Sequence, residues 1–123
     1  GRDRGGQHML WHVALTVAGS PHDDDAVRTA MLRLRDEHAF LHSLRYDVDR
    51  AEICYWEEAS DMLDVAALAM RVWAEHRDSA GLPRWNVVGL EVLDQLTYQL
   101  RTARGETFDD PGADVLAPIP VHF

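Results

Sequence analysis

Residues 40–58 read FLHSLRYDVDRAEICYWEE, and the alternation of apolar and polar side chains in this stretch decides the fold. Apolar residues at every second position are typical of a half-buried β-strand. The alternation predicts a strand over 40–48, a turn at 49–51 and a return strand over 52–58. Two strands joined by a short loop indicate an antiparallel hairpin, so the centre of the chain supplies two neighbouring strands.

The residues before the hairpin predict a helix over 24–38. Apolar residues recur there at spacings of three and four, which places them along one face of a helix. The acidic run 23–25 stands at the first turn, where carboxylates cap a helix and interact favourably with its dipole. The apolar stripe, which is expected to cover a sheet, consists of Val27, Ala30, Met31 and Leu34.

A second helix is predicted after the hairpin, with Ser60 or Asp61 as its N-cap. Its end carries the sharpest local signal in the sequence. Gly81 can adopt the left-handed conformation, Leu82 can fold back onto the last turn, and Pro83 cannot continue a helix. The residues expected to pack along this helix are Val65, Leu68, Ala69, Val72, Trp73 and His76.

A first strand over 11–17 and a last strand over 85–93 complete the order β-α-β-β-α-β. Two interleaved right-handed β-α-β units of this kind give a four-stranded antiparallel sheet, in the order 4-1-3-2, with both helices on one face. The predicted fold class is therefore α+β, a ferredoxin-like βαββαβ domain followed by an extended C-terminal tail.

These patterns divide the chain into three parts. Residues 9–100 are predicted to form the ferredoxin-like domain. Residues 1–8 begin without Met and lead into a His-Met pair of the kind that cloning sites leave, so they are interpreted as an arm derived from cloning. Residues 101–123 contain several Gly and Pro residues and are expected to form an irregular tail.

Composition limits the partners and the compartment. The formal net charge is -9, and no basic run interleaved with aromatic residues is present, so nucleic acid is not an expected partner. No apolar run approaches the roughly 20 residues that a membrane span needs, so no membrane partner is expected. A single cysteine, Cys54, favours the reducing cytoplasm. Every basic residue is Arg, which we interpret as the codon use of a GC-rich bacterial genome.

Strand parity predicts which side chains face the helices and which face the open side of the sheet. The side expected to face the helices carries Val13, Leu15, Val17, Leu44, Tyr46, Val48, Ile53, Tyr55, Val88, Leu90 and Val92. The open side is expected to carry His12, Ala14, Thr16, Ser43, Arg45, Cys54, Trp56, Glu58, Val87, Gly89, Glu91 and Leu93. The rim of this face provides the candidate ligand-binding residues His12, Arg45, Trp56 and Glu91. Its floor is expected to consist of the small side chains Ala14, Thr16, Cys54 and Gly89.

Two hypotheses for function follow from this open face. The first is a non-enzymatic binding or interaction module that forms a homodimer through an apolar patch of Trp56, Val87 and Leu93, because such patches mark contact surfaces. The alternative is a sensor or enzyme for a small anionic ligand, with Arg45 as anion anchor and Trp56 as stacking wall. The two hypotheses are compatible if a dimer encloses the pocket.

No catalytic residue, metal or cofactor is predicted. His38 and His42 have the four-residue spacing of two metal ligands on one helix, but the helix is expected to end between them. Cys54 is expected to lie near His12 on the adjacent strand. Nothing in the sequence predicts the basic environment that a reactive thiolate needs, so Cys54 is interpreted as a small buried residue.

Overall fold

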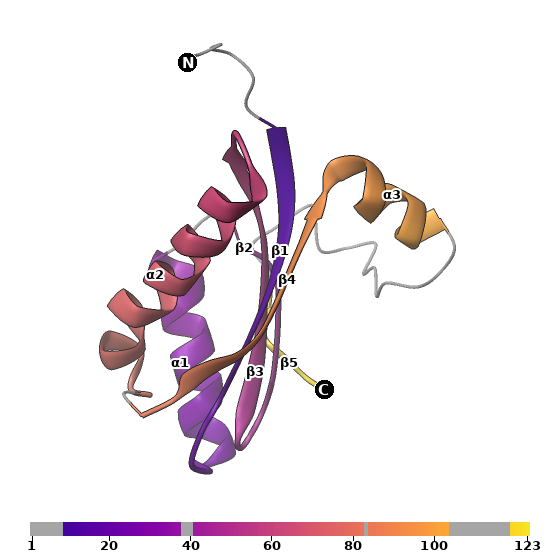
Figure 1. Cartoon of the computed structure of the whole chain (residues 1–123). Coiled ribbons are helices and arrows are strands. Elements are labelled where there is room, and N and C mark those ends of the chain that lie inside the picture. The colour runs from indigo at the N-terminus through magenta and orange to yellow at the C-terminus, as the bar shows by residue number, and fades with distance from the viewer. Residues whose placement is uncertain (1–8, 38–40, 83, 104–118) are drawn as a thin grey trace.

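The computed structural model describes residues 9–37, 41–82, 84–103 and 119–123, which form an α+β fold with three helices and a five-stranded mixed sheet (Figure 1). The elements are β1 (Met9–Ala18), α1 (Asp24–Glu37), β2 (Leu41–Asp47), β3 (Arg50–Ala59), α2 (Met62–Ala80), β4 (Asn86–Asp94), α3 (Gln95–Ala103) and β5 (Val121–His122). The sheet order is β4-β1-β3-β2-β5. The predicted four-strand order is therefore confirmed, and β5 is added at one edge, parallel to β2.

The core lies between the sheet and the helices α1 and α2, which both cover the same face (Figure 1). The four residues predicted to form the apolar stripe of α1 are all buried. On α2 the buried residues are Val65, Ala69, Trp73 and Ala80. The indole Nε1 of Trp73 donates a hydrogen bond to the carbonyl of Trp85 at 2.9 Å, so this side chain ties α2 to the segment that enters β4.

Both ends of α2 follow the sequence signals. The Asp61 carboxylate accepts a hydrogen bond from the Asp64 amide at 2.9 Å, which satisfies one of the free amides of the first turn. Gly81 has a φ of 94°, in the left-handed region. The Leu82 amide donates to the Arg77 carbonyl at 2.8 Å, and the Leu82 side chain is fully buried. Pro83 lies outside the described residues.

A β-bulge in β4 corrects the predicted assignment of its side chains. Thr16 pairs with Gly89, but the next residue of β1, Val17, pairs with Val87. Val88 is the extra residue, and each added residue reverses the strand parity beyond it. Val87, predicted on the open side, therefore packs against the core, whereas Val88, predicted on the helix side, is 61% exposed.

A second bulge changes the start of β2. Leu41 pairs with Tyr55, and Ser43 pairs with Cys54, which leaves His42 as the extra residue between them. The predicted alternation placed His42 on the side of Leu44, and the structure instead places it beside the open face. The hairpin turn is also tighter than predicted, because β3 already begins at Arg50. Val48 lies in this turn and is exposed, so its predicted place in the core was wrong.

Two elements of the structure had no counterpart in the sequence analysis. Helix α3 follows β4 directly and lies on the side of the sheet opposite α1 and α2 (Figure 1). Strand β5 pairs with the free edge of β2, and the Phe123 amide donates to the Tyr46 carbonyl at 3.0 Å. The end of the expected tail therefore lies against its own sheet. The proposed arm 1–8 and the part of the tail over 104–118 lie outside the described residues.

Candidate functional site

Strand register arranges the open face in three rows across the sheet. The middle row contains three small side chains, Ala14, Cys54 and Ser43, with Glu91 at its end, because Ala14 pairs with both Cys54 and Glu91, and Cys54 pairs with Ser43. The row on one side contains Leu93, His12 and Trp56. The row on the other side contains Gly89, Thr16, Glu52 and Arg45. A shallow floor thus separates an aromatic row from a charged row.

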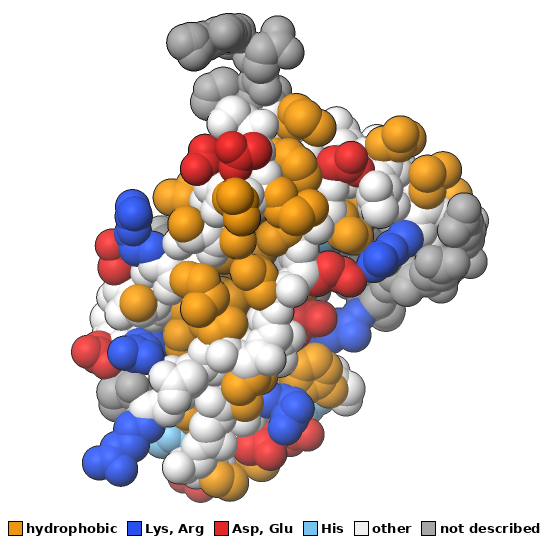
Figure 2. All heavy atoms as spheres, in the orientation of Figure 1, with side chains coloured by type: hydrophobic (Ala, Val, Ile, Leu, Met, Phe, Trp, Pro, Cys, Tyr) orange, Lys and Arg blue, Asp and Glu red, His pale blue; other side chains and the backbone are white. Residues whose placement is uncertain are grey.

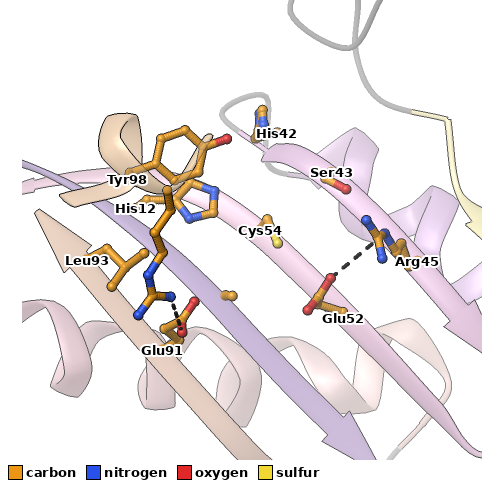
Figure 3. A pocket seen from close by; sticks show the side chains of 11 residues that line it. His12, His42, Ser43, Arg45, Glu52, Cys54, Glu91, Leu93 and Tyr98 are labelled. Carbon is orange, nitrogen blue, oxygen red and sulfur yellow. Dashed lines mark hydrogen bonds and ion pairs between the residues drawn. The ribbon is translucent and has the colours of Figure 1, made fainter. Parts of the chain in front are cut away.

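A pocket of about 260 Å³ lies over this floor, bounded by the open face and α3 (Figure 3). Helix α3 contributes Tyr98 and Arg101, and the other described lining residues come from β1, β2, β3 and β4. The lining residues are His12, Ala14, His42, Ser43, Arg45, Glu52, Cys54, Glu91, Leu93, Tyr98 and Arg101.

Three of the four candidate ligand-binding residues line this pocket: His12, Arg45 and Glu91. The fourth, Trp56, is not among the lining residues. Its ring contacts His12 and Tyr98, with centroid separations of 5.0 Å and 4.9 Å. Trp56 therefore packs against two residues that line the aromatic end of the pocket, without lining the pocket itself. Of the expected floor, Ala14 and Cys54 line the pocket, whereas Thr16 and Gly89 lie outside it.

His12 is the buried polar group of the site, with 7% of its surface exposed. Its ring stacks against Tyr98 at a centroid separation of 4.2 Å and meets His42 edge-on at 5.6 Å. Burial is the main cause that lowers the His12 pKa to about 4; His42 lowers it further, and Glu91 opposes the shift. His12 is therefore a neutral imidazole at pH 7, able to donate one hydrogen bond and accept another.

The His12 Nε2 atom is buried and finds no hydrogen-bond partner in the part of the chain that the structure describes. In Figure 3 the imidazole lies below the Tyr98 ring and borders the space above Cys54. A buried polar atom without a partner costs about 1–3 kcal/mol relative to a satisfied one. Native proteins leave few such atoms, and those that remain call for an explanation such as a bound molecule.

Two opposite charge pairs stand on the walls. Arg101 Nη1 of α3 lies 2.8 Å from Glu91 Oε2 of β4, which ties the helix to the sheet. On the far side of the floor, Arg45 Nε lies 4.0 Å from Glu52 Oε1 (Figure 3). That distance exceeds the length of a hydrogen bond between these two atoms. The wall therefore presents both signs of charge to whatever enters the pocket.

Most of the chain matches the model of one protein family. The family described as a domain of unknown function, DUF8830, matches residues 10–109. The chain belongs to the DUF8830 family. The eleven described residues that line the pocket all fall inside the part of the chain that matches DUF8830. No curated protein and no solved structure matches the chain at a significant level.

The Cys54 thiol of this DUF8830 domain is not activated. Burial is the main cause that raises its pKa to about 12; Glu52 adds to the shift, and Arg45 opposes it. A thiol with this pKa stays protonated at neutral pH, whereas nucleophilic attack requires the thiolate. Cys54 is a buried residue of the pocket floor, in agreement with its interpretation as a small buried residue.

No three side chains of the types that bind metals converge within residues 9–37, 41–82, 84–103 and 119–123. His38, the partner considered for His42, lies outside these ranges. None of the described helices is long and apolar enough to cross a membrane.

Sequence reasoning missed four residues that line the pocket: His42, Glu52, Tyr98 and Arg101. His42 was missed because the bulge at β2 leaves no mark in the alternation. Tyr98 and Arg101 were missed because α3 was not predicted. A local signal for α3 exists, since the Asp94 carboxylate accepts a hydrogen bond from the Thr97 amide at 2.8 Å, which is an N-cap contact.

Proposed function

We propose that this domain binds a small polar molecule in the pocket between the open face and α3. The observation that carries the proposal is the buried Nε2 atom of His12, which has no partner among the described residues. A bound molecule that hydrogen-bonds to this atom removes the cost of leaving it unsatisfied. The domain then acts as a sensor or carrier, with no reactive side chain required.

The volume of the pocket limits the size of the ligand. A volume of about 260 Å³ equals that of about nine molecules of liquid water, each of which takes up about 30 Å³. A metabolite of roughly ten non-hydrogen atoms fits this space on the same measure. A dinucleotide is several times too large.

Arg45 is the proposed anchor for an anionic group of the ligand. Its guanidinium lines the pocket and is partly exposed, so it can be approached from the cavity. Arginine pairs with carboxylates through two parallel hydrogen bonds, which gives both affinity and orientation. A carboxylate is therefore the expected group at this end of the pocket.

Binding of small carboxylates is the first test of this proposal. We expect at least one metabolite of this size to raise the melting temperature of the wild-type domain in a thermal-shift screen. Arg45→Gln is expected to weaken its binding by about tenfold or more, which corresponds to the loss of one charge-assisted contact. Arg50→Gln is the matched control, because Arg50 is the first residue of β3 and does not line the pocket. Equal binding by wild type and Arg45→Gln would contradict the assignment of the anchor.

A homodimer is our second proposal, and its contact surface differs from the one predicted from the sequence. Val87 packs against the core and Trp56 contacts Tyr98 of α3. These two residues therefore do not form the exposed apolar patch that was predicted. On the same side of the sheet, α3 exposes Leu96 by 64% and Leu100 by 49%, and none of its residues is fully buried (Figure 2). Apolar side chains gathered on one exposed helix favour a contact with a second copy.

Light scattering tests the homodimer directly. We expect a mass of twice 13.9 kDa at high concentration, and a monomer after the double change Leu96→Gln and Leu100→Gln. Leu63→Gln is the control, because Leu63 is equally apolar and 81% exposed but belongs to α2 on the other side of the sheet. A wild-type monomer at every concentration would refute the dimer. The cytoplasm remains the proposed compartment, supported by the free thiol of Cys54.

A further inference from the structure

We infer that the ligand of this pocket is a zwitterion, an α-amino acid whose side chain ends in an uncharged hydrogen-bonding group. The inference rests on the proposed function and specifies its ligand class. It follows from the charge balance of the pocket wall, the position of one cross-strand pair and the neutral imidazole at the opposite end.

The charge balance favours a ligand that carries both signs of charge. Among the described residues, the wall contains two guanidinium groups, Arg45 and Arg101, and two carboxylates, Glu52 and Glu91. A ligand with only anionic groups brings a third negative charge toward the two glutamates in a partly desolvated space, which is unfavourable. A ligand with only a cationic group is repelled by the two arginines for the same reason. A ligand with both groups can pair each charge with its opposite.

The Arg45–Glu52 pair matches the head group of an α-amino acid. These residues are direct cross-strand partners of β2 and β3, and their opposite charges stand side by side in Figure 3. The carboxylate and ammonium of an α-amino acid are likewise adjacent, because both are bonded to one carbon. The ligand carboxylate is placed at Arg45, beside Ser43 of the same strand, and the ammonium at Glu52.

The head group at this pair directs the ligand side chain toward His12. His12 and Thr16 lie four residues apart on β1, and Thr16 pairs directly with Glu52 of β3. His12 and Glu52 are therefore two rows apart on the open face. At about 3.3 Å per residue this spans roughly 13 Å between backbones, and the protein side chains at both ends shorten the gap. Ala14 and Cys54 form the small floor between, and Leu93 and Tyr98 flank the far end. The buried, neutral His12 favours an uncharged donor or acceptor, such as an amide, because a charged group would have to be desolvated at this end.

A matched series of ligands tests this inference by titration calorimetry on the wild-type domain. The probes are L-glutamine, glutaramate without the α-ammonium, 4-aminobutanamide without the carboxylate, and L-norleucine, which replaces the amide with a methyl-ended chain. We expect L-glutamine to bind at least about tenfold more tightly than each of the others.

The outcomes separate this inference from the proposed function. Equal binding of glutaramate and L-glutamine would overturn the zwitterion and leave small-carboxylate binding intact. Equal binding of L-norleucine would overturn the role of the distal polar group. Binding of none of the probes, together with no hit in the thermal-shift screen, would overturn both the inference and the proposed function.

Variants assign the effect to named residues. Glu52→Gln is expected to weaken the binding of L-glutamine by about tenfold, because it removes the partner of the ammonium. Glutaramate, which lacks the ammonium, is expected to bind at least as tightly as before, because the change removes a carboxylate that repels it. Glu58→Gln is the control on the same strand, since Glu58 does not line this pocket. His12→Phe is expected to abolish the preference for L-glutamine over L-norleucine. An equal loss for both probes in Glu52→Gln would contradict the ammonium contact.

Discussion

Replacing Trp73 with alanine is expected to lower the free energy of unfolding by about 3–5 kcal/mol, as large-to-small changes of buried tryptophans do. Trp73 is among the largest fully buried side chains of the core. Alanine removes its apolar contacts and leaves the carbonyl of Trp85 without the indole that donates to it at 2.9 Å. Urea denaturation followed by circular dichroism measures the loss.

Trp73→Phe separates the two contributions of this residue. Phenylalanine keeps most of the apolar volume and loses the hydrogen bond, so a smaller cost of about 1–2 kcal/mol is expected. Because Trp73 lies on the helix-covered face, the folded Trp73→Phe variant is expected to bind the pocket ligand as the wild type does. A stability change below about 1 kcal/mol for Trp73→Ala would contradict its place in the core.

Acidification is expected to destabilise the domain through His12. Burial holds the folded-state pKa of His12 at about 4, whereas an unfolded histidine titrates near 6.5. Between these values the unfolded state binds more protons, so stability falls as the pH drops from about 6.5 to 4 and is unaffected by His12 above that window. The full loss from this residue is about 3 kcal/mol at one pKa unit per 1.36 kcal/mol.

The variant His12→Gln isolates this contribution. Its stability is expected to lack the part of the decline that the wild type shows between pH 6.5 and 4. Asp94 does not contribute to the decline in this pH range. The hydrogen bonds from Thr97 lower the pKa of Asp94 from 3.8, so the stability that this carboxylate contributes is lost only at lower pH. An NMR titration of the His12 ring with a midpoint near 6.5 would contradict the buried neutral imidazole.

Much of the fold could be predicted because the core pattern is regular. The stripe of α1 and the end of α2 at Gly81 are local signals that the final packing reinforces. The order of the four main strands followed from chain order and the handedness of β-α-β units. Val87 and His42 were misplaced because a bulge depends on the pairing of two strands and is not visible in either strand alone.

The candidate site was predicted in part for a related reason. His12, Arg45 and Glu91 occupy regular strand positions, so parity brought them together on the open face. The roof of the pocket depends on α3, a helix of nine residues with no fully buried side chain. So short a helix is held by tertiary contacts such as the Arg101–Glu91 pair, which the sequence periodicity does not reveal.

Chemical-shift mapping by NMR tests the central claim most directly, since it shows where a small molecule binds. On addition of a metabolite selected by the thermal-shift screen, the largest amide shifts are expected at His12, Ala14, Ser43, Arg45, Glu52, Cys54, Glu91, Tyr98 and Arg101, the residues around the pocket. The Nε2 resonance of His12 is expected to move as this atom gains a hydrogen-bond partner. Shifts confined to α1 and α2, with the His12 ring unchanged, would contradict a binding site between the open face and α3.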